Sequence, residues 1–148
     1  MKQSVRPFLI ILVFSLVTSG LLFSIQSFSS DTGKDNEWKV PERAARKKNP
    51  FPADEKSIAA GKVVYIKECL SCHGATGKGD GPAAKDLQKS PGDLSNPKMW
   101  EQSDGALFWK ITTGKTPMPT YEKLLTEEQR WHVVNYSRTL APRPGEKK

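Results

Sequence analysis

Two cysteines and a histidine form the most chemically distinctive group in the chain. They stand together in the run Cys69-Leu70-Ser71-Cys72-His73. C-x-x-C-H is the spacing at which two thiolates add to the vinyl groups of a haem while the adjacent imidazole binds its iron. Both of the chain's 2 cysteines lie in this motif, so none remains for a disulfide framework. The motif therefore predicts one covalently attached haem c.

Two other functions of a C-x-x-C pair remain as alternatives. A thioredoxin-like dithiol normally lies where a strand meets a helix, within alternating strand and helix patterns, and the sequence has no such alternation. Structural zinc normally takes four Cys or His ligands. The chain offers two Cys and two His, and His132 is far from the motif. Both alternatives fit the sequence less well than haem attachment does.

The N-terminal segment predicts export from the cytoplasm. Lys2 and Arg6 precede the apolar, uncharged residues 8–23. This stretch exceeds the roughly 7–15-residue core of a signal peptide and falls short of the about 20 residues of a spanning helix. A cleaved signal peptide and an uncleaved membrane anchor both remain open, and the poor cleavage site at Ser27-Phe28-Ser29 favours the anchor. We expect the rest of the chain in the periplasm or on the outer face of a bacterial cytoplasmic membrane.

The charge of the chain is basic, with a net value of +7. The 23 Lys and Arg include Lys2 and Arg6, so 21 remain beyond this segment to face 16 Asp and Glu, a net charge of +5. Nucleic acid is not an expected partner, because an exported chain rarely meets it and the basic residues are scattered apart from residues 43–48. Much of this excess is surface charge, and its functional role would be docking on acidic redox partners.

The composition divides the chain into four stretches. Residues 1–30 are the signal peptide or anchor, and residues 31–53 are a polar, proline-containing tether or an arm that lies on the domain. Trp38 is a large apolar side chain of this second stretch, and we expect it to pin the arm to the domain. Residues 54–140 form the globular domain, and residues 141–148 form a flexible tail.

Three helices are predicted within the globular domain. The first runs from about residue 54 into Cys69, and the second covers about residues 103–113 and stops at Gly114. The third begins at Thr126, which has the capping-box spacing to Gln129. Little of the sequence has a strand pattern, so the fold class is all-α.

The stretch between the first two helices, residues 74–97, is rich in glycine and proline and predicts a long loop. A domain of about 87 residues is small for a self-sufficient core. A buried haem would supply the apolar body around which short helices pack, so we expect loss of haem to unfold the domain.

Residues 54–140 resemble the single-haem, class I cytochromes c of bacterial electron-transfer chains. The resemblance rests on four motifs in the expected order: Gly61-x-x-x-Tyr65-x-x-x-Cys69-x-x-Cys72-His73-Gly74, Gly77-Lys78-Gly79-Asp80-Gly81-Pro82, Ile111-x-x-Gly114-x-x-x-Met118-Pro119 and Trp131-x-Val133-Val134-x-Tyr136-x-Arg138-x-Leu140. It implies a small fold of about three main helices and loops around the haem. It also implies close packing of Gly61 against the last helix near Tyr136.

The resemblance further implies a second axial ligand to the iron, opposite His73. Apart from the initiator, the candidates are Met118, Met99 and His132. Met118 is favoured because prolines on both sides fix its backbone, whereas Met99 suits a gap in the core and His132 a partly exposed helix position. In the resemblance, a proline carbonyl after the motif accepts the other His73 ring N–H, which makes Pro82 the candidate acceptor.

The expected function is one-electron transport without catalysis, because His/Met ligation fills both axial positions and raises the reduction potential. The main alternative is a haem subunit of a larger membrane respiratory complex. A sensor or peroxidase with an open iron position is a third class.

Overall fold

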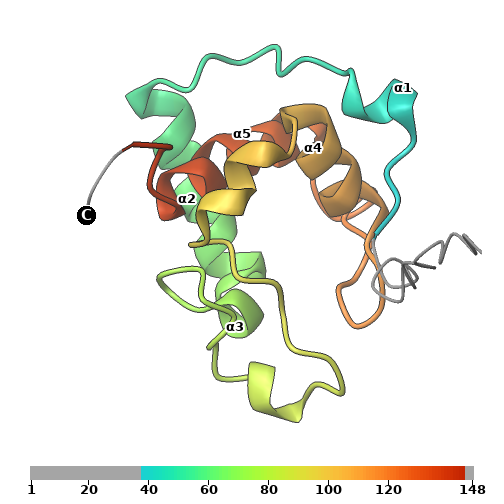
Figure 1. Ribbon diagram of the computed structural model, residues 1–148, viewed down its shortest axis with the longest axis vertical. Helices are drawn as coiled ribbons and strands as arrows, with labels where there is room; N and C mark the ends of the chain where they lie inside the picture. The colour runs from blue at the N-terminus through green and yellow to red at the C-terminus, as the bar shows by residue number, and fades with distance from the viewer. Residues whose placement is uncertain (1–37, 146–148) are drawn as a thin grey trace, which may run out of the picture. The chain divides into compact units, whose positions relative to one another are not determined.

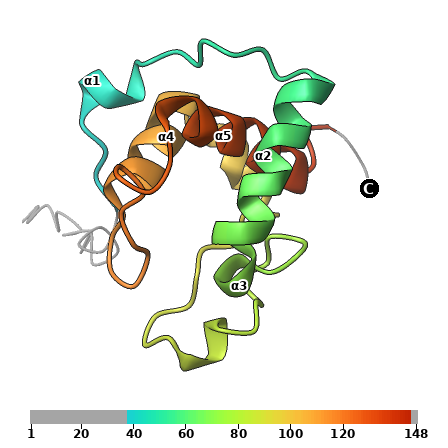
Figure 2. The same ribbon diagram turned by 180° about the vertical axis from the view of Figure 1, so that it is seen from behind.

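The computed structural model describes residues 38–145, and this part of the chain is helical (Figures 1 and 2). The α-helices are α1 (Glu42–Ala45), α2 (Glu55–Glu68), α3 (Leu70–His73), α4 (Asp104–Thr113) and α5 (Glu127–Leu140), and the 3-10 helices are η1 (Ala84–Asp86) and η2 (Pro97–Glu101). The described residues contain no strand, only an isolated bridge between Lys115 and Met118. The all-α prediction is confirmed, and α2, α4 and α5 correspond to the three predicted helices.

Each of these helices begins at a side chain that caps it. Asp54 accepts a hydrogen bond from Ser57 N at 2.8 Å, and Ser103 accepts one from Ala106 N at 3.2 Å. Thr126 and Gln129 form the predicted capping box before α5. These side chains satisfy backbone N–H groups that have no partner within the helix, which fixes where each helix starts.

The crossing of α2 and α5 depends on Gly61. A Cβ at this position would overlap the carbonyl oxygen of His132 and lie 2.9 Å from Cβ of Tyr136. One turn further along α2, the rings of Tyr65 and Tyr136 contact each other with centroids 5.0 Å apart. The expected packing of Gly61 against the last helix is confirmed.

The aromatic residues of α4 and α5 form the centre of the core. The rings of Phe108 and Trp131 stack with their centroids 3.9 Å apart. Met99, Leu107, Val134 and Ala141 complete this cluster of buried residues. A second cluster joins α2 to α5 and to the segment before α5, through Val64, Tyr121, Leu125 and Val133.

Residues 38–53 pack against α4 and α5. A Cβ at Gly105 of α4 would lie 2.5 Å from Lys47 O, so this arm passes directly over α4. Lys47 Nζ lies 2.6 Å from Glu127 Oε1, and Asn49 Nδ2 donates to Asn135 Oδ1 at 2.8 Å. Residues 38–53 therefore belong to the same compact unit as α2, α4 and α5.

The long loop after α3 closes on itself. Leu94 N donates to Gly77 O at 2.6 Å, and a Cβ at Gly79 would lie 2.7 Å from Pro91 O. The loop therefore returns residues 90–94 to the C-terminal end of α3, beside the predicted haem motif.

The apolar segment of residues 8–23 lies outside the described residues, as do residues 31–37 of the expected tether. Within residues 38–145, no helix has the length and apolar character needed to cross a membrane.

Replacing Gly61 with Ala should lower the free energy of unfolding by about 1–3 kcal/mol, because the added methyl group has no space between α2 and α5. Denaturant unfolding of the haem-loaded protein measures this. Lys62→Ala is the matched control, since Lys62 is the next residue of α2 and is exposed. Equal stability of the two variants would contradict the close crossing.

Candidate functional site

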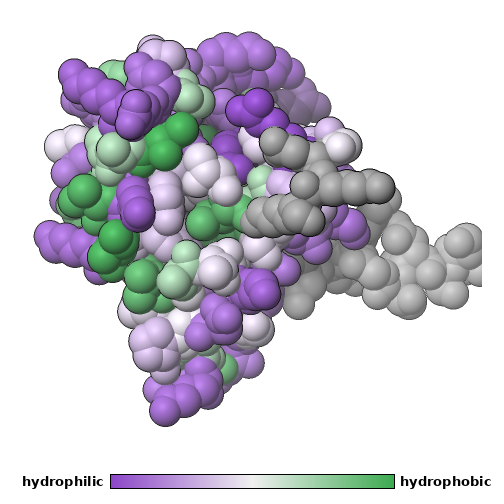
Figure 3. Space-filling model, turned by 90° about the vertical axis from the view of Figure 1, so that its left-hand side faces the viewer, coloured by the Kyte–Doolittle hydropathy of each residue, from purple (hydrophilic) through white to green (hydrophobic). Residues whose placement is uncertain are grey.

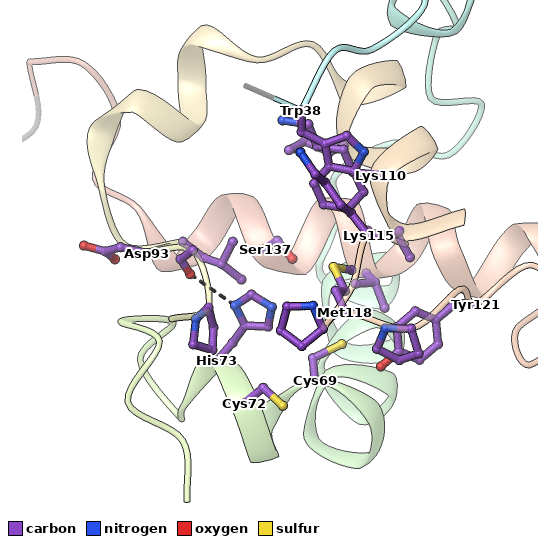
Figure 4. Close-up of a pocket in the computed structure, with 18 of the residues that line it drawn as sticks. Trp38, Cys69, Cys72, His73, Asp93, Lys110, Lys115, Met118, Tyr121 and Ser137 are labelled. Carbon is purple, nitrogen blue, oxygen red and sulfur yellow. Dashed lines mark hydrogen bonds between the residues drawn. The ribbon is translucent and has the colours of Figure 1, made fainter. Parts of the chain in front are cut away.

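Cys69, Cys72 and His73 lie on one helical turn at the end of α2. Cys69 is the junction residue between α2 and α3, and His73 N donates to Cys69 O at 2.9 Å. Because residues at i, i+3 and i+4 share one face of a helical turn, the three side chains are presented together. Figure 4 shows them side by side at one end of a pocket.

The ring of His73 is oriented by a backbone carbonyl. Its Nδ1 lies 3.2 Å from Gly92 O, in the segment that the long loop brings back to α3. The opposite ring nitrogen, Nε2, therefore points away from Gly92. A hydrogen bond of this kind selects the tautomer whose Nε2 is free to bind a metal.

The expected pairing of His73 with Pro82 is wrong in this structure, since the acceptor is Gly92. Residues 81–83 instead lie along the backbone of α3, where Gly81 N donates to Cys72 O at 3.1 Å and Ala83 N donates to Ser71 O at 2.8 Å. Pro82 lines a separate, shallow depression on the surface.

Two tyrosines brace the haem motif from either side. Tyr65 donates its hydroxyl to Gly74 O at 2.8 Å, directly after His73. Tyr121 donates its hydroxyl to Glu68 O at 2.8 Å, directly before Cys69. The backbone is thus held at both ends of the motif, by the hydroxyl of Tyr65 from α2 and by that of Tyr121 from the segment between α4 and α5.

The pocket beside the motif has a volume of about 370 Å³. This is within the range of roughly 300–1,000 Å³ typical of cofactor sites. Apolar side chains from four parts of the chain contribute to its wall, including Trp38, Leu94, Leu107, Ile111 and Val133. Figure 4 places Trp38 and Lys110 at the end of the pocket away from Cys69 and Cys72.

Met118 lines the same pocket from the loop between α4 and α5. Its backbone is fixed by reciprocal hydrogen bonds with Lys115, of 3.0 Å and 2.9 Å. Its side chain is partly buried against the cluster that contains Val64 and Tyr121, as is Cys69. The structure therefore brings Met118 to the cavity of the cysteines and His73 (Figure 4).

The other two candidate axial ligands have different surroundings. Met99 is 4% exposed within the core cluster, and its sulfur lies 3.8 Å from Gln102 Nε2, although it also reaches the pocket wall. His132 is at the interface of α2 and α5, where its Nδ1 lies 2.7 Å from Ser57 Oγ and its Nε2 lies 3.3 Å from Glu128 Oε1. Both ring nitrogens of His132 are thus engaged away from the pocket.

Burial makes Cys69 an unsuitable redox thiol. Desolvation raises its pKa to about 12, with smaller contributions from Glu68 and Cys72. A reactive dithiol needs the opposite, a pKa lowered toward neutrality. Burial also lowers the pKa of His73, although the hydrogen bond to Gly92 O acts in the opposite direction. The lowered pKa keeps the imidazole neutral, as a metal ligand must be.

The residues present fit a haem. Cys69 and Cys72 would form thioethers at one end of an apolar cavity, and His73 would present Nε2 to the iron. Within residues 38–145, no group of three or more His, Cys, Asp or Glu side chains is placed to hold a metal ion. When bound, the haem supplies an iron that alternates between Fe(III) and Fe(II).

Residues 56–136, more than half of the chain, match the family model described as cytochrome C oxidase, cbb3-type, subunit III. The chain belongs to this cytochrome c family. Haem c is therefore its cofactor, and the class I cytochrome c resemblance of residues 54–140 is confirmed.

Known proteins similar to this cytochrome differ in size. It is 40% identical over 85 residues to cytochrome c6 of Rippkaea orientalis, covering 57% of this chain and 72% of that protein. It is 30% identical over 118 residues to the thiosulfate dehydrogenase of Stutzerimonas stutzeri, covering 74% of this chain and 36% of that enzyme. Among solved structures, it matches the Kuenenia stuttgartiensis reducing HAO-like protein complex Kustc0457/Kustc0458 with a TM-score of 0.56 and 32% identity, covering 62% of this chain and 47% of that one.

Two features of the cytochrome pocket were missed by the sequence analysis. Gly92 orients His73 through its carbonyl oxygen, which every residue type carries, so no side-chain signal exists for it. Trp38 was expected only to pin the arm, yet it also lines the pocket, where its ring stands edge-on to Trp109 with centroids 6.3 Å apart. Nothing in the local sequence specifies that the arm crosses α4.

A Cys69→Ala/Cys72→Ala variant of the cytochrome should lose its pigment on denaturing extraction, because no thioether would hold the haem. Mass spectrometry of the wild type should give the polypeptide plus haem, and the variant should weigh only its amino acids. We also expect the colourless variant to lose its cooperative thermal transition. A wild-type protein without added mass, expressed in a host that matures cytochromes c, would contradict thioether attachment.

Proposed function

We propose that this cytochrome is a one-electron carrier with a single haem c, attached through Cys69 and Cys72 and ligated by His73 and Met118. The observation that supports the ligand pair is the position of Met118. A loop between α4 and α5, far from the motif in sequence, brings its side chain into the pocket that His73 also lines (Figure 4).

This ligand pair favours electron transport over catalysis. A thioether in the second axial position leaves no site on the iron for oxygen or substrate, and it raises the reduction potential relative to a second His. The carrier would take an electron from a dehydrogenase or quinol-oxidising complex and pass it to an oxidase or another acceptor. The similarity to cytochrome c6 supports an electron carrier.

The proposed location is the periplasm or the outer face of a bacterial cytoplasmic membrane. The support is the sequence of residues 1–30, with two basic residues before an uncharged apolar stretch. As an anchor, this segment would keep the haem domain near its membrane-bound partners. As a cleaved signal peptide, it would release the domain into the periplasm.

A haem subunit of a larger complex is the second candidate. It is favoured by the names of the matched proteins, since the family description refers to a subunit, one solved structure is a complex and one relative is a dehydrogenase. The cytochrome spans only 36% of that dehydrogenase, so an enzyme would need further parts. Co-purification in mild detergent separates the two candidates, because a free carrier comes away alone.

The outward face of α2 is the docking surface we propose for a redox partner. Val63 and Ile66 are 69% and 53% exposed on it, and Figure 3 shows apolar residues gathered on this side of the molecule. Exposed lysines flank them along the same helix: Lys56, Lys62 and Lys67. An apolar centre with a cationic border suits a transient contact with an acidic partner.

Replacing Met118 with Ala should lower the reduction potential and allow the reduced protein to bind carbon monoxide. The physical reason is that a vacated axial position admits exogenous ligands and loses the thioether that stabilises Fe(II). Potentiometric titration and optical spectra with carbon monoxide measure both effects.

Met99→Leu is the matched control, because Met99 belongs to the core. This substitution should leave the reduction potential and the carbon monoxide binding near their wild-type values. An unchanged spectrum in Met118→Ala would remove Met118 from the ligand set. Strong carbon monoxide binding by the wild type would favour the sensor or peroxidase class.

Oxidation of the reduced cytochrome by the anionic complex ferricyanide should slow as ionic strength rises. Cationic groups around the electron-transfer surface attract an anionic reactant. Salt weakens this attraction, because charges further apart than the Debye length, about 10 Å at an ionic strength of 0.1 M, are largely screened from each other. Lys62→Glu/Lys67→Glu should slow the reaction several-fold at low salt. Stopped-flow kinetics measure the rate.

The matched control is Arg43→Glu/Lys48→Glu, which changes the net charge equally at exposed positions of the arm. If both double variants slow the reaction equally, net charge alone governs the rate and the α2 surface has no special role.

A further inference from the structure

Arg130 is a buried cation near the start of α5. It is 7% exposed, and no salt bridge joins it to a carboxylate within residues 38–145. A buried charge without a partner is costly, so its surroundings must compensate. The electron-carrier proposal does not itself assign a role to this residue.

The compensation comes from the segment that follows Met118. Arg130 Nη1 donates to three backbone carbonyl oxygens, those of Tyr121 at 3.3 Å, Glu122 at 2.9 Å and Leu125 at 2.7 Å. The guanidinium carbon also lies 5.2 Å from the ring centroid of Phe108, which is itself stacked on Trp131. The turn of residues 121–125 is therefore wrapped around a cation that the core aromatics hold in place.

This turn determines the position of the Met118 loop. Tyr121 is three residues after Met118, and its hydrogen bonds join it to α2 and to α4. Its hydroxyl donates to Glu68 O beside Cys69, and its backbone N donates to Ile111 O of α4 at 3.3 Å. Thr120 adds a hydrogen bond from Oγ1 to Thr112 O at 2.7 Å.

We propose that Arg130 is a positioning residue for the second axial ligand, holding the 121–125 turn so that Met118 is presented to the iron. The inference rests on the proposed ligation by Met118. A thioether binds iron weakly, so the ligand depends on a loop that is ordered before it binds. If the turn moved, Arg130 would remain buried with its carbonyl acceptors lost, which opposes release of the loop.

An alternative is that Arg130 only stabilises the core. The two roles differ in what a variant changes. A purely structural residue lowers the unfolding temperature and leaves Met118 bound in the molecules that remain folded. A positioning residue also weakens Met118 ligation in the folded state, at temperatures well below the transition.

The experiment uses the full haem-loaded chain and three variants. Arg130→Met removes the charge and keeps the length of the side chain. Arg130→Lys keeps the charge on a shorter side chain, so its nitrogen no longer reaches the position that Nη1 holds among the three carbonyls. Lys123→Met removes an exposed cation from the same turn and is the control.

The measurements are the methionine-to-iron charge-transfer absorption of the oxidised protein, the affinity of the oxidised protein for added imidazole, and thermal unfolding. In Arg130→Met we expect weaker charge-transfer absorption and an increase in imidazole affinity of about tenfold, with an intermediate effect in Arg130→Lys. Lys123→Met should match the wild type. Far-UV circular dichroism at the measuring temperature establishes that each variant is folded.

A lower unfolding temperature with unchanged absorption and imidazole affinity would overturn the positioning role. So would equal imidazole affinity in Arg130→Met and Lys123→Met. Failure of Met118 ligation itself is recognised separately, because the wild type would then lack the charge-transfer absorption and Met118→Ala would not differ from it. That result would overturn both proposals.

Discussion

The close crossing of α2 and α5 at Gly61 is the constraint on which the rest of the structure depends. It brings the two 14-residue helices α2 and α5 together without an intervening side chain, because any Cβ at Gly61 would overlap the His132 carbonyl. The crossing fixes the C-terminal end of α2, where Cys69 lies, relative to the aromatic core of α5. Tyr65 extends the contact toward the motif by reaching both Tyr136 and Gly74 O.

The pocket is assembled around this crossing by segments that have little regular structure. The loop of residues 74–97 returns Gly92 to His73, the loop after α4 contributes Met118, and the arm contributes Trp38. Burial by these segments also sets the chemistry of the motif. It raises the pKa of the Cys69 thiol, which disfavours thiol exchange, and it lowers the pKa of the His73 imidazole, which leaves a neutral ring for a metal.

We propose two distinct roles for cations in the described part of the molecule. The lysines of α2 are exposed and border the apolar side chains of Val63 and Ile66, where their charge acts on whatever approaches. Arg130 is buried and directed at backbone carbonyls, where its charge acts on the protein's own loop. Net charge alone, which is +7 for the chain, does not distinguish these roles. Burial and the identity of the acceptor do.

The sequence by itself determined the features whose physical cause is local. C-x-x-C-H predicts its chemistry because three side chains on one turn suffice, and the capping box at Thr126 marks the start of α5 within four residues. The close contact of Gly61 with α5 was implied only by the family resemblance. The acceptor of His73, the path of the arm and the acceptors of Arg130 were decided only by the tertiary structure. Each involves a backbone carbonyl or a surface that a distant segment happens to meet, and because every residue carries a carbonyl group, residue type gives no signal of which one lies within reach.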